Sequence, residues 1–390
     1  MSACLLRSAL IAAFLSVSVA QLPPSANSIP ADSNAVRWMG RYEADGSGGV
    51  GFDWEGVSAS VTLANFTYLT VDIADACMGT SYVGGGSRWA VDITTSDAGV
   101  APPRHRIATF FSLPYIKTYA LFSNAGGACN PGCSFTGNST FTLTRLTESR
   151  VSGCTAKGNL SVLAFASDGA FLAPRARAPR AIEFIGDSIS AGDLNDGAAA
   201  DGSAPALCGN IAMNDDITKT SGARLCQPPP TGFDAECYFT AWGGITLGGM
   251  AGRLYESTFS ALGPGDAYGT WNFTEHRVDA VIINLGTNDH PAAPALGWQA
   301  KYAAFVQRAV VLYGAPAPTF FLAFGPMTNE YEPFVLNISA VLTTAGIRAF
   351  PLDLTLPHAR TGCFGHPSAA DNVEIAAKAR PQIAAAMGWA

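Results

Sequence analysis

The sequence predicts a protein of two domains, an all-β sandwich followed by an α/β domain built on a parallel sheet. From about Val36 to Thr144, β-branched and aromatic residues alternate with small polar ones, which is the period of half-buried strands. After Ala181, short apolar segments without alternation are separated by longer segments of helical period. Continuous apolar strands with intervening helices are typical of a parallel sheet that is covered on both faces.

Residues 1–20 have the pattern of a secretory signal peptide. Arg7 supplies a positive charge, "SALIAAFLSVSVA" is apolar, and small residues at 18–20 precede the expected cleavage before Gln21. The apolar run is shorter than the roughly 20 residues of a membrane helix, and we expect no membrane anchor. Because of this signal peptide, we expect a secreted, extracellular protein.

The length of the chain agrees with two domains. Even after removal of the leader, the 390-residue chain is longer than one hydrophobic core usually requires.

The cysteines and glycosylation motifs agree with an oxidising compartment. Each half of the chain after the leader has an even number of cysteines, as two disulfides per domain would require, although four cysteines allow three pairings. They are Cys77, Cys129, Cys133 and Cys154, then Cys208, Cys226, Cys237 and Cys363. Five glycosylation motifs occur, at Asn65, Asn138, Asn159, Asn272 and Asn337. CxxC and HExxH motifs are absent, so we expect neither a metal nor another cofactor.

The charge balance limits the partners of the protein. The net charge is −7, with only 23 basic residues, which argues against nucleic acid and against an anionic membrane surface. Charged residues make up 14% of the chain, which agrees with a neutral substrate. The sequence gives no indication of the oligomeric state.

The N-terminal domain is expected to span residues 21–173, followed by a linker at 174–180. Its strands are expected in segments of two-residue period that Gly, Asn and Asp turns separate. They are "GVSASVTLANFTYLTVDIAD", "RWAVDIT" and "STFTLTRLT", and "NLSVLAFASDGAFLAP" adds one or two more. The Pro- and Arg-rich "APRARAPR" marks the linker. This pattern predicts an antiparallel β-sandwich.

The C-terminal domain is expected to span residues 181–390. Its strands are expected at "AIEFIG", the short run "YFTA", "AVIINLG", "TFFLAFGP" and "IRAFPLDL". Its helices are expected at "GWQAKYAAFVQRAVVLY", "YEPFVLNISAVLTTAG" and "AADNVEIAAKARPQIAAAM". Ligands of such sheets bind beyond the carboxyl ends of the strands, so the polar residues there are the candidate site.

Four segments place chemically useful groups at strand ends or in loops. Ser188 follows the first strand, Gly243 and Gly244 follow the second, Asn288 follows the third, and His366 precedes the last helix. Each has an ordinary structural explanation as a helix cap, a turn or a surface loop. Together they supply a hydroxyl nucleophile, N–H donors, an amide and an imidazole base, which are the groups that acyl transfer requires.

The order of these segments resembles the SGNH (GDSL-type) hydrolases, whose blocks are Gly-Asp-Ser, a lone Gly, Gly-x-Asn-Asp and Asp-x-x-His. Ser190 stands where a G-x-S-x-G elbow would have its second glycine. The stretches "IEFIGDSISAG", "AWGG", "GTND" and "GCFGHPS", behind a sandwich that carries "GRYEADGSGGVGFDWEGVSASV", are similar to the two-domain carbohydrate esterases of family two. The resemblance covers the domain order of most of residues 36–390.

This resemblance implies a flavodoxin-like three-layer catalytic domain behind a jelly-roll-like sandwich, and a secreted serine esterase that hydrolyses O-acetyl esters on poly- or oligosaccharides. It implies Ser188 as the nucleophile and His366 as the base. The oxyanion hole would consist of the Ser188 N–H, Gly244, with Gly243 as the alternative, and the Asn288 side chain. The two remaining block residues would hold loops by hydrogen bonds, and these are Asp187 and Asp289.

The sequence departs from the family pattern near His366. Asp-x-x-His spacing puts the acid at Cys363, and Asp-x-His spacing puts it at Phe364, where the family often has a Trp nearby. Either a backbone carbonyl orients the His366 ring in a Ser-His dyad, or an acid such as Asp353 or Asp371 comes from elsewhere. A disulfide at Cys363 would stiffen the loop of the histidine.

Three further expectations accompany this departure. Cys237 is the expected partner of Cys363, since it lies just ahead of the glycine pair. His358 is the competing base, and His290 is expected at the rim of the site. The alternative functions are a lipid or aryl esterase of the same superfamily and a glycan-binding protein with an inactive site.

Overall fold

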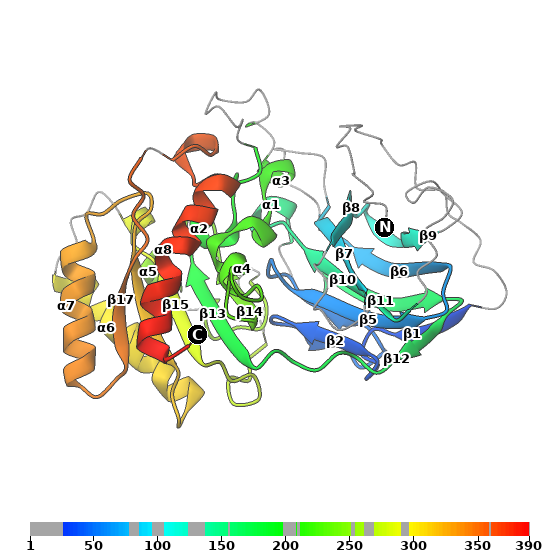
Figure 1. Cartoon of the computed structure of the whole chain (residues 1–390), viewed down its shortest axis with the longest axis horizontal. Coiled ribbons are helices and arrows are strands. Elements are labelled where there is room, and N and C mark those ends of the chain that lie inside the picture. The colour runs from blue at the N-terminus through cyan, green and yellow to red at the C-terminus, as the bar shows by residue number, and fades with distance from the viewer. Residues whose placement is uncertain are drawn as a thin grey trace, which may run out of the picture.

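The structure is a computed structural model of the whole chain. It describes residues 26–77, 86–95, 105–123, 137–154, 157–197, 208, 211–250, 254–260, 269–289, 296–358 and 360–389. The expected signal peptide, Cys129, Cys133 and His290 lie outside the described residues. Two domains lie side by side, the strands of the first on the right of Figure 1 and the mixed domain on the left.

The first domain is an antiparallel β-sandwich, as the alternating pattern predicted. One sheet has the order β3-β4-β11-β6-β9, with β1 beside β11, and the other has the order β12-β5-β10-β7-β8, with β2 beside β5. The first contains β1 (Asn27–Pro30), β3 (Glu43–Ala44), β4 (Val50–Gly51), β6 (Tyr68–Asp75), β9 (Tyr115–Ser123) and β11 (Leu160–Ser167). The second contains β2 (Val36–Met39), β5 (Ser58–Ala64), β7 (Arg88–Thr95), β8 (His105–Phe111), β10 (Ser139–Arg145) and β12 (Ala170–Leu172).

The apolar residues that recur at every second position form the inward faces of these sheets. On β6, Leu69, Val71 and Ile73 are at most 1% exposed, because alternate side chains of a strand point to the same side. On β5, Val61 lies opposite Phe141 of β10, so the second sheet contributes to the same core. Beyond the predicted segments, the sandwich also contains a single helical turn, α1 (Ser149–Ser152), and the strands β1, β2, β3, β4, β8 and β9.

The second domain has a five-stranded parallel sheet of order β14-β13-β15-β16-β17, which confirms the predicted α/β class. Its strands are β13 (Arg180–Gly186), β14 (Ala235–Ala241), β15 (Ala280–Asn284), β16 (Thr319–Phe324) and β17 (Ala349–Asp353). The long helices are α6 (Leu296–Tyr313), α7 (Glu332–Thr344) and α8 (Ala369–Met387). Short helices are α2 (Ser188–Ala191), α3 (Ile211–Asn214), α4 (Ser221–Leu225) and α5 (Leu247–Gly249).

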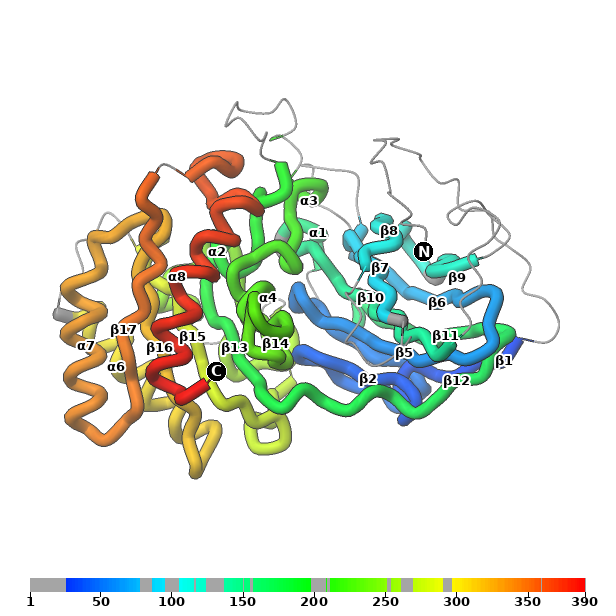
Figure 2. The backbone as a smooth tube through the Cα atoms, viewed as in Figure 1, coloured from blue at the N-terminus to red at the C-terminus, as the bar shows by residue number. Residues whose placement is uncertain are grey.

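Helices cover both faces of this sheet and so form three layers. Ile185 of β13 belongs to the buried cluster that includes α6 and α7. Ile182 and Phe184 of the same strand belong to the cluster that includes α4 and α8. Figure 2 follows the chain from the sandwich, through an extended segment, into the inner strand β13. β13 is therefore buried on both faces and flanked on both edges, by β14 and β15.

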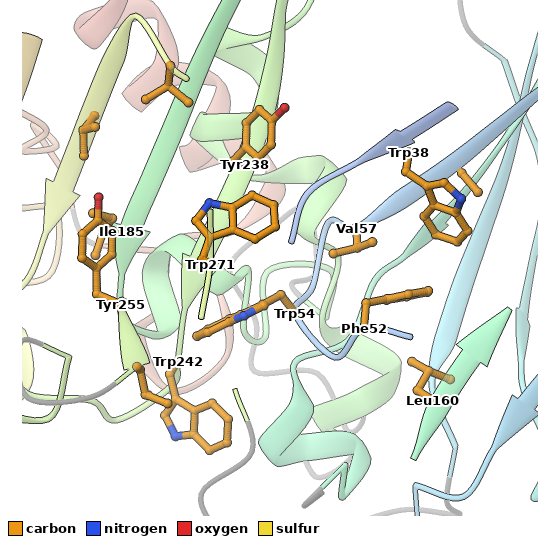
Figure 3. Packing of buried hydrophobic residues seen from close by; sticks show 14 of the residues in the cluster. Trp38, Phe52, Trp54, Val57, Leu160, Ile185, Tyr238, Trp242, Tyr255 and Trp271 are labelled. Atoms are coloured by element: carbon orange, nitrogen blue, oxygen red, sulfur yellow. The ribbon is translucent and has the colours of Figure 1, made fainter. Parts of the chain in front are cut away.

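The two domains share one apolar core. Residues of both domains form a single buried cluster, and Figure 3 shows Trp54 of the β4–β5 loop between the sandwich side chains and Trp271 and Trp242 of the second domain. The guanidinium of Arg41 crosses the same boundary and donates to Glu183 of β13 at 2.8 Å, with both side chains at most 1% exposed. The sandwich is thus directly attached to the strand that leads to Ser188.

Candidate active site

Ser188 begins helix α2 directly after the inner strand β13. The Asp187 side chain caps this helix by accepting a hydrogen bond from the Ile189 N–H at 3.0 Å. A Cβ on Gly186 would clash with the Ser190 side chain, so glycine favours this tight transition from strand to helix. The Gly-Asp-Ser sequence therefore fixes the serine at the carboxyl edge of the sheet, where it is 7% exposed.

His366 faces this serine across the site. Its Nε2 lies 3.0 Å from the Ser188 Oγ, and its Nδ1 lies 3.2 Å from the backbone oxygen of Cys363. The ring comes from a tight turn in which Phe364 has φ 53° and is 71% exposed, and Gly365 has φ 76°. Two residues 178 positions apart in the sequence are thereby joined by a hydrogen bond that suits proton transfer.

The two acids that the sequence offered bond to other groups. The Asp353 carboxylate accepts hydrogen bonds from the backbone and hydroxyl of Thr355 and pairs with the Lys378 ammonium at 2.8 Å. The Asp371 carboxylate binds the N–H groups of Thr361 and Ser368. Neither carboxylate holds the His366 ring, whereas the carbonyl arrangement that the sequence left open is present.

His358, the competing base, does not face the serine. Its Nε2 lies 3.0 Å from Asp371 Oδ1 and its Nδ1 lies 3.7 Å from Glu374. The interpretation of His358 as the base is therefore wrong in this structure. His358 is instead the neighbour of a carboxylate at the start of α8.

The segment after β14 contacts the segment after β15. The Asn288 amide donates to the backbone oxygen of Ile245 at 3.1 Å, and the Asp289 carboxylate accepts from the Leu247 N–H at 3.0 Å. An amide group has two donors, so one N–H of Asn288 remains for a ligand. Gly244 has φ 77° and is exposed, with open space where a Cβ would be. The two segments that contain Gly244 and Asn288 are thus joined by hydrogen bonds.

Burial sets the protonation of the supporting acids. Desolvation raises the pKa of Asp187 to about 7, although the Ile189 N–H and the Thr287 side chain act in the opposite direction. Desolvation also raises the pKa of Asp289, and the Leu247 N–H opposes that shift. Near neutral pH, the Asp187 carboxyl is thus protonated in part of the molecules.

A disulfide holds the histidine turn, but not with the expected partner. Cys363 is joined to Cys208, 155 residues away in the sequence. Cys237 lies in the buried strand β14 and is joined to Cys226, which follows α4, so the expectation of a Cys237–Cys363 bridge is wrong. Cys77 and Cys154 form a disulfide in the sandwich.

Arg360 is a site residue that sequence reasoning missed. Its guanidinium donates to the backbone oxygens of Gly365, Pro326 and Met327 at 2.8 to 3.2 Å, which joins the histidine turn to the segment after β16. No motif signals this role, because all three acceptors are backbone atoms. Among the described residues, no group of three or more His, Cys, Asp or Glu side chains is arranged to hold a metal ion.

Comparisons with known proteins identify this fold. No family model and no curated protein matches the sequence. A family two carbohydrate esterase from Cellvibrio japonicus is similar in structure, with a TM-score of 0.74, 20% identity, and coverage of 94% of this chain and 99% of that one. A family two carbohydrate esterase from Clostridium thermocellum, solved with cellohexaose, has a TM-score of 0.68 at 21% identity, with 91% of this chain and 100% of that one covered.

A third similar structure is an acetyl xylan esterase from Butyrivibrio proteoclasticus. Its TM-score is 0.69 at 18% identity, with 93% of this chain and 98% of that one covered. The chain therefore has the two-domain fold of these carbohydrate esterases over nearly its whole length. Within the part of the chain that the structure describes, no helix has the length and apolar character to cross a membrane.

Proposed function

We propose that this protein is a secreted serine esterase that removes acetyl groups from carbohydrate, with Ser188 as the nucleophile and His366 as the base. The observation that carries the proposal is the 3.0 Å contact between Ser188 Oγ and His366 Nε2, with the far side of the ring directed at the Cys363 carbonyl. The fold shared with carbohydrate esterases and the small share of charged residues support a carbohydrate ester as the substrate.

In the proposed reaction, Ser188 Oγ attacks the acetyl carbon while His366 Nε2 takes the hydroxyl proton. The carbonyl π electrons move to oxygen, and the resulting oxyanion is stabilised by the N–H groups of Ser188 and Gly244 and by the Asn288 amide. Each such donor contributes about 3 kcal/mol to stabilising this state. The intermediate then expels the sugar oxygen, which receives the proton from His366, and leaves an acetyl-serine.

Hydrolysis of the acetyl-serine completes the cycle. Water attacks the acetyl carbon, His366 takes one proton from that water, and the Ser188 oxygen leaves and regains a proton from the imidazolium. The Cys363 carbonyl fixes the tautomer that keeps Nε2 free to accept, because Nδ1 carries the proton that points at it. A carbonyl stabilises the imidazolium less than a carboxylate would, so we expect slower turnover than a full triad gives.

The test is Ser188→Ala, assayed with p-nitrophenyl acetate and with acetylated xylo-oligosaccharides. Loss of the nucleophile should lower kcat by about 10³-fold or more without changing the thermal midpoint. Ser190→Ala is the matched control, since it removes a hydroxyl from the same helix but not from the proposed reaction. A Ser188→Ala enzyme within about tenfold of the wild type would contradict the proposal.

Two measurements separate the alternative functions. A fall in kcat/KM from acetyl to butyryl esters supports the carbohydrate acetyl esterase, whereas a rise toward long acyl chains supports a lipid esterase. Labelling of Ser188 by a fluorophosphonate probe supports an active site of either kind. Binding of a glycan without labelling would support a glycan-binding protein with an inactive site.

A further inference from the structure

The buried carboxylate of Asp371 joins the two ends of the loop that carries His366. Its Oδ2 accepts hydrogen bonds from the N–H of Thr361 and the N–H of Ser368, both at 2.8 Å, and from the Thr361 hydroxyl at 2.9 Å. Its Oδ1 lies 3.0 Å from the His358 Nε2. The side chain is 2% exposed, so these contacts form away from bulk water. One oxygen atom thus holds two backbone groups that lie seven residues apart.

The loop between these two attachment points is narrow. The Gly362 N–H donates to the His366 carbonyl at 2.9 Å, and the His366 N–H donates to the Cys363 carbonyl at 3.0 Å. The same Cys363 oxygen is the contact of the His366 Nδ1. The position of the imidazole and the position of its acceptor therefore depend on one short turn, whose base is fastened by Asp371.

We propose that Asp371 is a positioning residue for His366, which it orients through the backbone rather than through the ring. This inference rests on the proposed function. The Cys363 carbonyl can orient the imidazole only if the carbonyl itself is held in place. A displacement of the order of 1 Å in an active site lowers rates about 100-fold. An acid on the ring would fix the imidazole directly, and here the acid fixes the turn that supplies the carbonyl.

The electrostatics agree with this role. Burial alone would raise the pKa of Asp371, but the N–H groups of Thr361 and Ser368 and the His358 side chain together hold it below the ordinary value. The carboxylate is therefore charged at neutral pH, and its hydrogen bonds are of the stronger, charge-assisted kind. Asp371 also completes a capping box with Ser368 at the start of α8, which attaches the base of the loop to a 19-residue helix.

The experiment compares Asp371→Ala with Asp371→Asn, using p-nitrophenyl acetate and the labelling rate of Ser188 by a fluorophosphonate. We expect Asp371→Ala to lower kcat and the labelling rate by about 10- to 100-fold, with KM within about twofold of the wild type. Asp371→Asn should recover most of this loss, because one amide oxygen can accept both N–H groups. Asp353→Ala is the matched control, since it removes a carboxylate that binds Thr355 and Lys378 instead.

Several outcomes would overturn the proposal: a kcat of Asp371→Ala within about twofold of the wild type, an effect on KM alone, or an equal loss in Asp353→Ala. If Asp371→Ala does not fold, Thr361→Val decides, because it removes one donor to the carboxylate. A several-fold lower kcat then supports the proposal, and an unchanged kcat overturns it. A wild-type protein that neither hydrolyses the ester nor labels would refute the proposed function instead.

Discussion

Replacement of Arg41 by methionine tests how strongly the sandwich stabilises strand β13 of the α/β domain. The Arg41 guanidinium donates to Glu183 at 2.8 Å and to the backbone oxygen of Ser257 at 2.8 Å, and neither side chain of the ion pair is more than 1% exposed. The guanidinium also lies 5.2 Å from the ring centres of Tyr255 and Phe273. Methionine keeps most of the volume and removes all of these polar contacts.

The expected loss of stability follows from the charge that remains. Removal of one partner of a buried ion pair costs about 3–5 kcal/mol, because the other charge stays buried. Glu183 keeps hydrogen bonds from Thr240 at 3.0 Å and from the Tyr313 hydroxyl at 2.6 Å, which places the expected value near 3 kcal/mol. A domain is stable by only about 5–15 kcal/mol, so this loss is large.

The assay is urea unfolding followed by tryptophan fluorescence, with Arg37→Met as the matched control. Arg37 pairs with Glu236 across the same domain boundary, but its side chain is 20% exposed and Arg177 also pairs with Glu236. We expect Arg37→Met to cost about 1 kcal/mol or less. The double variant Arg41→Met with Glu183→Gln should recover part of the loss, because it removes the orphaned charge. A cost for Arg41→Met no larger than that of Arg37→Met would refute this reasoning.

Two further predictions concern the strand end at Ser188. The pKa of Asp187 is raised to about 7 in the folded protein, so between about pH 4 and pH 7 the folded state binds a proton that the unfolded state lacks, and stability falls as the pH rises. Asp187→Asn should flatten the pH profile of unfolding by up to about 1.4 kcal/mol per pH unit in this window, and an unchanged profile would contradict the assignment. Gly186→Ala should cost about 1–3 kcal/mol of stability and lower the proposed esterase activity, since its Cβ would meet the Ser190 side chain. Unfolding and kinetics that match the wild type would contradict this expectation.

Much of the fold and part of the site are determined by the sequence alone. Apolar periodicity is a local property, because the side chains that share one face recur every two residues on a strand and about every 3.6 residues on a helix. This periodicity predicted the sandwich and the parallel sheet. Strand β1 was missed because it lies before the alternating stretch. The sequence also predicted Ser188, Asn288 and His366 as candidate site residues, because short motifs at strand ends and before a helix contain them.

Only the tertiary structure decided how the parts of the site are joined. The acceptor of His366 is the carbonyl of Cys363, and a backbone oxygen leaves no signal in a residue pattern. Cys363 is paired with Cys208, although the even count of cysteines permitted other pairings. Asp371 has the residue type of a catalytic acid, yet it binds the base of the histidine loop. Each of these three contacts joins groups that the folded chain brings together in space, and the local propensity of a segment does not specify such contacts.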